Sequence, residues 1–189
     1  MDIGNKLYKK IGVMFPWPRS ILGQGYLRSL EYLLDGKLGD FVEYGRFASG
    51  SRVNDWVVPD EWRMTEAFIE DAETGERLID ARESNLRVVN YSSPVDSVMK
   101  GADLANHLYT SAIMPEAIPY VTSYYERNWG FCVTARERER LSDGLFRVVI
   151  SSSFVKGELV IADMFFPGQT DEEIVFSSYL CHHSMANNE

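Results

Sequence analysis

Two adjacent histidines, His182 and His183, are the residues of this chain whose type and position most directly suggest chemistry. They follow the segment 174–181, which begins with an apolar run, and they precede the polar residues Ser184, Asn187, Asn188 and Glu189. In α/β proteins, buried strands deliver polar side chains to sites at their carboxyl ends. We therefore predict that residues 174–181 form a buried strand that carries the histidine pair to a site.

The histidine pair by itself leaves two interpretations open. Imidazole is a common metal ligand, but a zinc ion takes four or more donors that converge from several segments of a chain. Residues 182–189 supply at most two or three of these donors. Taken alone, the pair is either part of a metal site or the polar beginning of a loop.

The composition is that of a globular protein, and we expect a cytoplasmic protein because the N-terminus is a poor signal peptide. A chain of 189 residues with 45% hydrophobic residues can fill the core of one domain, or of one domain with a small insert. The net charge of −9 argues against nucleic acid or an anionic membrane as the main partner. We identify neither a membrane span nor a signal peptide. Cys132 and Cys181 form no CxxC pair, so we expect free thiols.

Two helices are expected near the N-terminus. Over residues 1–15, apolar residues recur every four positions, which is the spacing of one helical face. A second helix follows Gly25, because its leucines share one broad face, and Gly36 is its stop signal. We expect Ser20 to lie near the N-cap of this second helix.

From residue 41 to residue 91 the pattern changes to short strands. We predict strands over 41–44, 53–58, 67–70, 77–80 and 86–91. Residues 71–76 read as a hairpin turn with a glycine at position 75. Short strands at this spacing favour a small β-sandwich or curled sheet, in whose core we expect Trp56 and Trp62.

The second half of the chain combines short helices, aromatic residues and strands. We expect a helix over 103–109, a charged helix opened by a capping box from Thr134 to Glu137, and strands over 146–150 and 159–166. The aromatic stretch 118–132 either packs as a core segment or lines a pocket. The candidate pocket residues are Tyr124, Arg127, Trp129 and His183.

Several motifs in one order along the chain resemble a known family. They read RSILGQG at 19–25, DWVVPDEW at 55–62, NLRVVNYS at 85–92, IPYVTSYY at 118–125, WGFC at 129–132 and CHHSMANN at 181–188. The first resembles the family's R-S-I-T-G-x-G, and the last is similar to C-H-P-S-x-A-N-D. By this resemblance the chain is identified as the N-terminal part of a bacterial family of aminopeptidase-like proteins in the di-zinc aminopeptidase superfamily.

The resemblance implies an α/β fold with three parts. Residues 1–44 would form an N-terminal helical segment of the aminopeptidase-like domain, and residues 45–100 a β-rich insert. Residues 101–189 would return to the aminopeptidase-like domain and end at the first strand of its metal site. The zinc-aminopeptidase-like sheet is then incomplete within this chain, because a parallel sheet needs covering helices after its strands.

The resemblance also assigns residues to a metal site. His182 matches the family's zinc histidine, and Asn188 falls where the family has an aspartate that bridges two zinc ions. His183 replaces the motif's proline. A neutral Asn amide offers one good oxygen donor, so it should hold two dications less well than a carboxylate does. The family's general base and its other ligands have no matching positions in residues 1–189.

The function implied by the resemblance is metal-dependent hydrolysis of peptide or amide bonds, with zinc as cofactor and a peptide or a small amide as substrate. Two explanations fit the positions at which this sequence differs from the family's motif. Either the peptidase half lies beyond residue 189, which is the account we favour, or the chain is a short relative that has lost metal catalysis. The expected partners are a missing C-terminal half or a second copy of the chain. The alternative function is a non-catalytic module that binds a peptide, a glycan or a partner protein through residues 120–131, Trp56 and Trp62.

Overall fold

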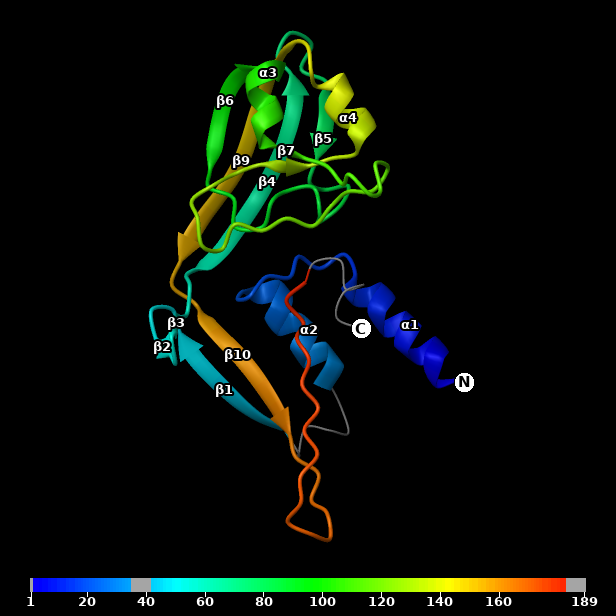
Figure 1. Ribbon diagram of the computed structural model, residues 1–189, viewed down its shortest axis with the longest axis vertical. Coiled ribbons are helices and arrows are strands. Elements are labelled where there is room, and N and C mark those ends of the chain that lie inside the picture. Colours follow the sequence, from blue (N-terminus) through cyan, green and yellow to red (C-terminus); the bar gives the residue numbers. More distant parts are fainter. Residues whose placement is uncertain (1, 35–41, 183–189) are drawn as a thin grey trace. The chain divides into compact units, whose positions relative to one another are not determined.

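The computed structural model describes residues 2–34 and 42–182, and these divide into two compact units. Unit 1 consists of Met1–Glu61 and Val155–Glu189, and unit 2 consists of Trp62–Phe154. The predicted α/β class is confirmed, with helices near the N-terminus and several small sheets that are mostly antiparallel (Figure 1). The domain boundaries predicted at residues 44 and 100 stay a prediction.

The two predicted N-terminal helices are present in unit 1. Helix α1 spans Ile3–Met14, and helix α2 spans Gln24–Leu34. The expectation that Ser20 lies near the N-cap of the second helix is wrong, because α2 begins four residues after Ser20. Gly23 has a φ of +113° and directly precedes α2. A residue in that conformation cannot belong to a right-handed helix, so the helix can start only after it.

Unit 1 also holds two small antiparallel sheets. Strand β1 (Val42–Ala48) pairs with β10 (Glu158–Met164), and strand β2 (Arg52–Val53) pairs with β3 (Trp56–Val57). The single strand predicted over 53–58 is therefore wrong. Asn54 has a φ of 56°, a left-handed conformation that asparagine tolerates, and it turns the chain back on itself. Trp56 is only half-buried.

Unit 2 is built on a four-stranded sheet in the order β5-β4-β9-β6. The strands span Glu61–Asp71 (β4), Arg77–Asp80 (β5), Val95–Lys100 (β6) and Leu145–Val155 (β9). The predicted hairpin between β4 and β5 is confirmed, and Gly75 has the positive φ, 73°, that its turn requires. Of the two predicted alternatives, a sandwich or a curled sheet, the structure has a single sheet here. Strand β6 was not predicted, because its apolar residues Val95, Val98 and Met99 do not alternate with polar ones along the sequence.

The core of unit 2 lies on one face of this sheet. The covering elements are α3 (Gly101–Leu104), the parallel pair β7 (Leu108–Tyr109) and β8 (Phe131–Cys132), and α4 (Ala135–Arg140). The sheet contributes Ala67, Ile69, Ile79, Val148 and Ile150, and the covering side contributes Leu104, Leu108, Phe131, Val133 and Leu141. Trp62 belongs to this core as predicted, and its Nε1 donates to the Ser92 carbonyl over 2.8 Å.

Two further predicted elements of unit 2 are shorter or absent. The helix predicted over 103–109 is replaced by α3, a 3-10 turn over Ala105–His107 and strand β7. The strand predicted over 86–91 is reduced to isolated bridges at Val88 and Asn90. Tyr91 has a φ of 69°, so the chain cannot continue as a strand there.

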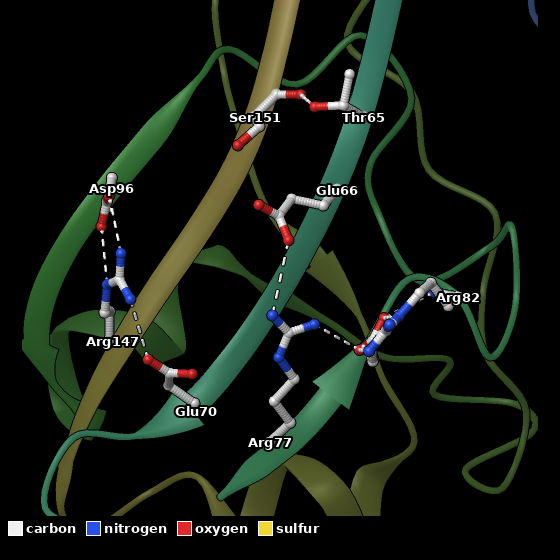
Figure 2. Close-up of polar contacts among 9 residues, drawn as sticks. Thr65, Glu66, Glu70, Arg77, Arg82, Asp96, Arg147 and Ser151 are labelled. Carbon is white, nitrogen blue, oxygen red and sulfur yellow. Dashed lines mark hydrogen bonds and ion pairs between the residues drawn. The ribbon is translucent and has the colours of Figure 1, made fainter. Parts of the chain in front are cut away.

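The opposite face of the sheet carries ion clusters (Figure 2). Arg147 of β9 lies between Asp96 of β6 and Glu70 of β4, with N–O distances of 3.1 and 3.2 Å. Phe68 also points to this face, because its neighbours Ala67 and Ile69 both point into the core. Its ring is only 4% exposed, since the guanidinium of Arg77 covers it at 3.8 Å. The paired charges therefore shield an aromatic ring on the polar face of the sheet.

The predicted capping box of α4 is confirmed and is joined to a buried arginine. The Thr134 hydroxyl accepts a hydrogen bond from the Glu137 amide, and the Glu137 carboxylate accepts one from the Thr134 amide. Arg87 donates to both oxygens of that carboxylate, over 2.7 and 2.8 Å. The Arg87 side chain is 10% exposed, so this bidentate pair ties the loop before Val88 to the start of α4.

The predicted strand over 174–181 is wrong for the described structure. Residues 165–182 have no regular secondary structure, and Ile174, Val175 and Phe176 are 84%, 81% and 93% exposed. An apolar run becomes a strand only where neighbouring strands supply hydrogen-bond partners. No strand within 2–34 and 42–182 pairs with this segment. In the same ranges, none of the helices is both long enough and apolar enough to cross a bilayer.

We predict that Arg87→Met destabilises unit 2 by about 3 kcal/mol, because the substitution leaves the Glu137 carboxylate half-buried without its cation. Urea unfolding followed by circular dichroism measures the change. Arg136→Met is the matched control, since Arg136 is an exposed arginine of α4, and it should change the unfolding free energy by less than about 0.5 kcal/mol. Equal effects of the two substitutions would contradict the role assigned to Arg87.

The stability of unit 2 should also depend on acid pH through Glu137. Burial raises the pKa of Glu137, but hydrogen bonds from Arg87 and Thr134 outweigh burial and lower it. A carboxyl with a lowered pKa stabilises the fold above its ordinary pKa of about 4.3, and that stabilisation is lost as the pH falls through the lowered value.

We therefore expect a roughly constant unfolding free energy between about pH 7 and pH 5 and a decline below about pH 4. Urea titrations at each pH measure it. Glu137→Gln should make the decline less steep, with a remainder from Asp80, whose pKa is lowered by hydrogen bonds from Arg82. Glu139→Gln, at an exposed position of the same helix, should leave the decline as in the unsubstituted chain. A decline of the same steepness in both variants would show that other carboxyls cause it.

Candidate functional site

His182, the predicted zinc histidine, lies in unit 1 and is bound through its backbone. Its carbonyl accepts a hydrogen bond from Nε of Arg19 over 3.0 Å. The Arg19 side chain is fully buried, and its Nη1 donates to the carbonyls of Met14, at 2.7 Å, and Trp17, at 3.5 Å. One guanidinium therefore joins the last residue of α1 to the histidine at the end of the 165–182 segment.

The residue before His182 is also close to the core of unit 1. Tyr26 of α2 donates its hydroxyl to the Val160 carbonyl of β10 over 2.7 Å. The pKa of Tyr26 is raised, first by burial and second by the charge that Cys181 would carry as a thiolate. Burial raises the pKa of the Cys181 thiol as well, so it is protonated at neutral pH. Cys181 therefore lies within electrostatic reach of the contact that joins α2 to β10.

The imidazole of His182 is in the form that binds metals. Burial lowers its pKa, and the positive charge of Arg19 lowers it further. A histidine with a lowered pKa is neutral at pH 7, and a neutral ring offers the nitrogen lone pair that a metal ion or a proton needs. The surroundings of His182 are thus compatible with the ligand role that the sequence resemblance implies.

The described residues do not complete a zinc site. Across 2–34 and 42–182, no group of three or more histidine, cysteine, aspartate or glutamate side chains is placed so that it could hold a metal ion. A zinc site takes four or more donors, so His182 with these residues is insufficient. The predicted positions His183 and Asn188 lie outside the described residues.

The glycines of the 19–25 motif allow its backbone to pack closely. A Cβ at Gly25 would lie 1.7 Å from the carbonyl oxygen of Pro18, so only glycine fits there. A Cβ at Gly23 would lie 3.5 Å from a carboxylate oxygen of Glu61, which is 7% exposed. The motif is therefore a compact turn that places Arg19 at the end of α1 and starts α2 directly afterwards.

The candidate pocket residue Tyr124 lies in unit 2 and packs within an aromatic group. Its ring meets Tyr91 edge-on, with 4.7 Å between ring centroids. Its hydroxyl accepts a hydrogen bond from the buried Asn90 side chain over 3.3 Å and lies 3.2 Å from the Tyr120 hydroxyl. These contacts fit the interpretation of 118–132 as a packed core segment.

Arg127 and Trp129, also in unit 2, contact other partners. The guanidinium of Arg127 lies over the Phe154 ring at 3.7 Å, and Trp129 stacks on His107 with 3.6 Å between ring centroids. Tyr125, between these residues and Tyr124 in sequence, is 83% exposed. The role of the predicted pocket residues in binding stays a prediction.

Arg19 and Tyr26 are the site residues that the sequence alone did not assign. Arg19 stands in a short run of apolar and small residues, which hints at a buried charge. Its carbonyl acceptor is 163 residues away in sequence, however, and a backbone acceptor leaves no trace in residue type. Only the folded chain shows what Arg19 binds.

A family model described as "Domain of unknown function (DUF2172)" matches residues 61–153. This range coincides with unit 2, whose bounds are Trp62–Phe154. The match thus marks the four-stranded sheet and its covering elements as a recurring module.

A longer relative matches nearly the whole chain. The "Putative polysaccharide biosynthesis protein with aminopeptidase-like domain" of Clostridium acetobutylicum is 36% identical over 187 residues, which are 99% of this chain and 42% of that protein. The crystal structure of a "putative peptidase" from Clostridium acetobutylicum superimposes with a TM-score of 0.85 at 36% identity, over 97% of this chain and 43% of that one. The chain therefore spans less than half the length of each protein, and it is homologous to a part of an aminopeptidase-like protein.

We predict that Gly25→Ala destabilises unit 1 by at least about 2 kcal/mol, because the new methyl group meets the Pro18 carbonyl and the backbone has to move. Thermal and urea unfolding measure the loss. Gly12→Ala, in helix α1, is the matched control: a Cβ there meets nothing within 4 Å, and alanine should stabilise the helix by about 0.5–1 kcal/mol. A neutral Gly25→Ala variant would contradict the packing described for the motif.

Proposed function

We propose that this chain is the N-terminal part of an aminopeptidase-like hydrolase that cleaves peptide or amide bonds and requires a metal. The observation that carries the proposal is the 36% identity to the Clostridium acetobutylicum protein over 99% of the chain. Because the chain spans 42% of that protein, the activity is proposed for the whole protein and not for residues 1–189 alone. The substrate class follows the relatives' names.

His182 is the described residue that we assign to this activity. Its ring is neutral at pH 7 because burial and the charge of Arg19 lower its pKa, and its backbone is held by a buried guanidinium. Zinc is the metal that the sequence resemblance implies, and it would bind water and a substrate carbonyl. The described residues supply too few donors for that ion, so His182 can be only one of its ligands.

Metal binding by His182 can be tested directly. The longer protein that contains this chain is dialysed with zinc, and its bound metal is measured by plasma mass spectrometry together with the hydrolysis of aminoacyl anilides. We expect His182→Ala to lower both the zinc content and the rate of hydrolysis. His107→Ala is the matched control, because it removes a histidine of unit 2 that is stacked on Trp129. It should leave both readouts unchanged.

The outcomes separate the proposal from its alternative. A longer protein that binds no zinc, with or without His182, overturns the metal-ligand role of His182. A folded, metal-free chain that binds peptides or glycans would instead favour the binding module predicted from the aromatic stretch. For that alternative, the exposed Tyr125 beside Tyr124 is the described feature that offers a contact surface.

A further inference from the structure

Arg19 is the largest fully buried side chain among the described residues. A guanidinium keeps its charge in proteins and has five N–H donors, so burying it is costly unless acceptors are arranged around it. Hydrogen bonds from such a residue can hold together segments that are distant in sequence. The identity of the segments that Arg19 holds therefore indicates its role.

Arg19 bridges two segments that are far apart in sequence. Its Nη1 donates to Met14 at the end of α1, where carbonyl groups lack partners within the helix. Its Nε donates to the carbonyl of His182 over 3.0 Å. These acceptors are backbone atoms, so the contact fixes the path of the chain at residue 182 through its carbonyl and not through its imidazole.

The 165–182 segment depends on anchors at its end. Residues 165–179 are exposed along their length, including Phe176 at 93%, and only 180–182 are half-buried. Segments with few buried contacts open locally at low free-energy cost. The hydrogen bond from Arg19 therefore acts at the place where the described segment meets the rest of unit 1.

We propose that Arg19 is a positioning residue, which fixes His182 through its backbone carbonyl and so joins the 19–25 motif to the end of the described 165–182 segment. The glycines of the 19–25 motif contribute to this positioning, because they allow the close turn that brings Arg19 to the end of α1. A catalytic consequence of the contact between Arg19 and His182 rests on the proposed function. The contact itself is independent of that function.

Thiol alkylation of the full chain tests the proposal without metal or substrate. Cys181, the neighbour of His182, is half-buried, and Cys132 of unit 2 is fully buried with a pKa raised by burial to about 12. Iodoacetamide is added, and the modification of each cysteine is followed by peptide mass spectrometry. Cys181 reports on the 165–182 segment, Cys132 reports on unfolding of unit 2, and the circular dichroism of helices α1 and α2 reports on unfolding of unit 1.

In Arg19→Met we expect Cys181 to react at least about tenfold faster, because the charged hydrogen bond to the His182 carbonyl is lost with the others of Arg19, while Cys132 keeps its rate and the circular dichroism of α1 and α2 is unchanged. Arg19→Lys keeps the charge and should give an intermediate rate. Arg28→Met is the matched control, because Arg28 is an exposed arginine of α2 that stacks on Trp17, and it should leave both rates unchanged.

Two results overturn the proposal: an unchanged Cys181 rate in Arg19→Met, or equal acceleration of both cysteines, which indicates loss of the whole fold. Where Arg19→Met does not fold, Arg19→Lys decides between selective and equal acceleration. If neither zinc binding nor hydrolysis is found, the proposed function is refuted, but the alkylation result for Cys181 is unaffected. A selective effect on Cys181 would likewise hold for a chain that binds no metal.

Discussion

The burial of the Arg19 guanidinium is the constraint on which the described part of unit 1 depends. A permanent charge inside a protein must be surrounded by acceptors, and Arg19 finds them in the backbone carbonyls of Met14, Trp17 and His182. The guanidinium thus links the end of α1 to the end of the 165–182 segment. The close approach of Gly25 to the Pro18 carbonyl keeps the turn that carries Arg19 compact.

Unit 2 also contains a buried arginine, Arg87, whose acceptor is a carboxylate and not a backbone carbonyl. The buried guanidinium of Arg87 binds both oxygens of Glu137, which is also the second partner of the capping box at α4. The charge of Arg87 is neutralised by Glu137, and both residues belong to unit 2. The contact therefore stabilises unit 2 internally. The ion clusters of Figure 2 lie on the outer face of the sheet, where they cover Phe68. Unit 2 is in this sense self-contained, in agreement with the family match to residues 61–153.

The function proposed for the protein joins these observations to its relatives. Similarity to the Clostridium acetobutylicum protein covers almost all of this chain but less than half of that protein. Within the described residues, His182 is held and neutral, yet it is not accompanied by enough donors for a zinc ion. Together these facts describe a chain that holds His182 by its backbone and contains a β-rich module matched by a family model, while metal binding and hydrolysis are proposed for the longer protein.

The sequence by itself determined the elements whose information is local. The four-residue recurrence of apolar residues predicted α1, the leucine face predicted α2, Gly75 predicted the hairpin of β4 and β5, and Thr134 with Glu137 predicted the capping box. Only the tertiary structure determined the features that depend on residues distant in sequence. The apolar run at 174–176 reads as a buried strand but is exposed, because strand formation needs neighbours that no local pattern contains. The hydrogen bond from Arg19 to His182 could not be predicted from the sequence either, since its acceptor is a backbone carbonyl 163 residues away.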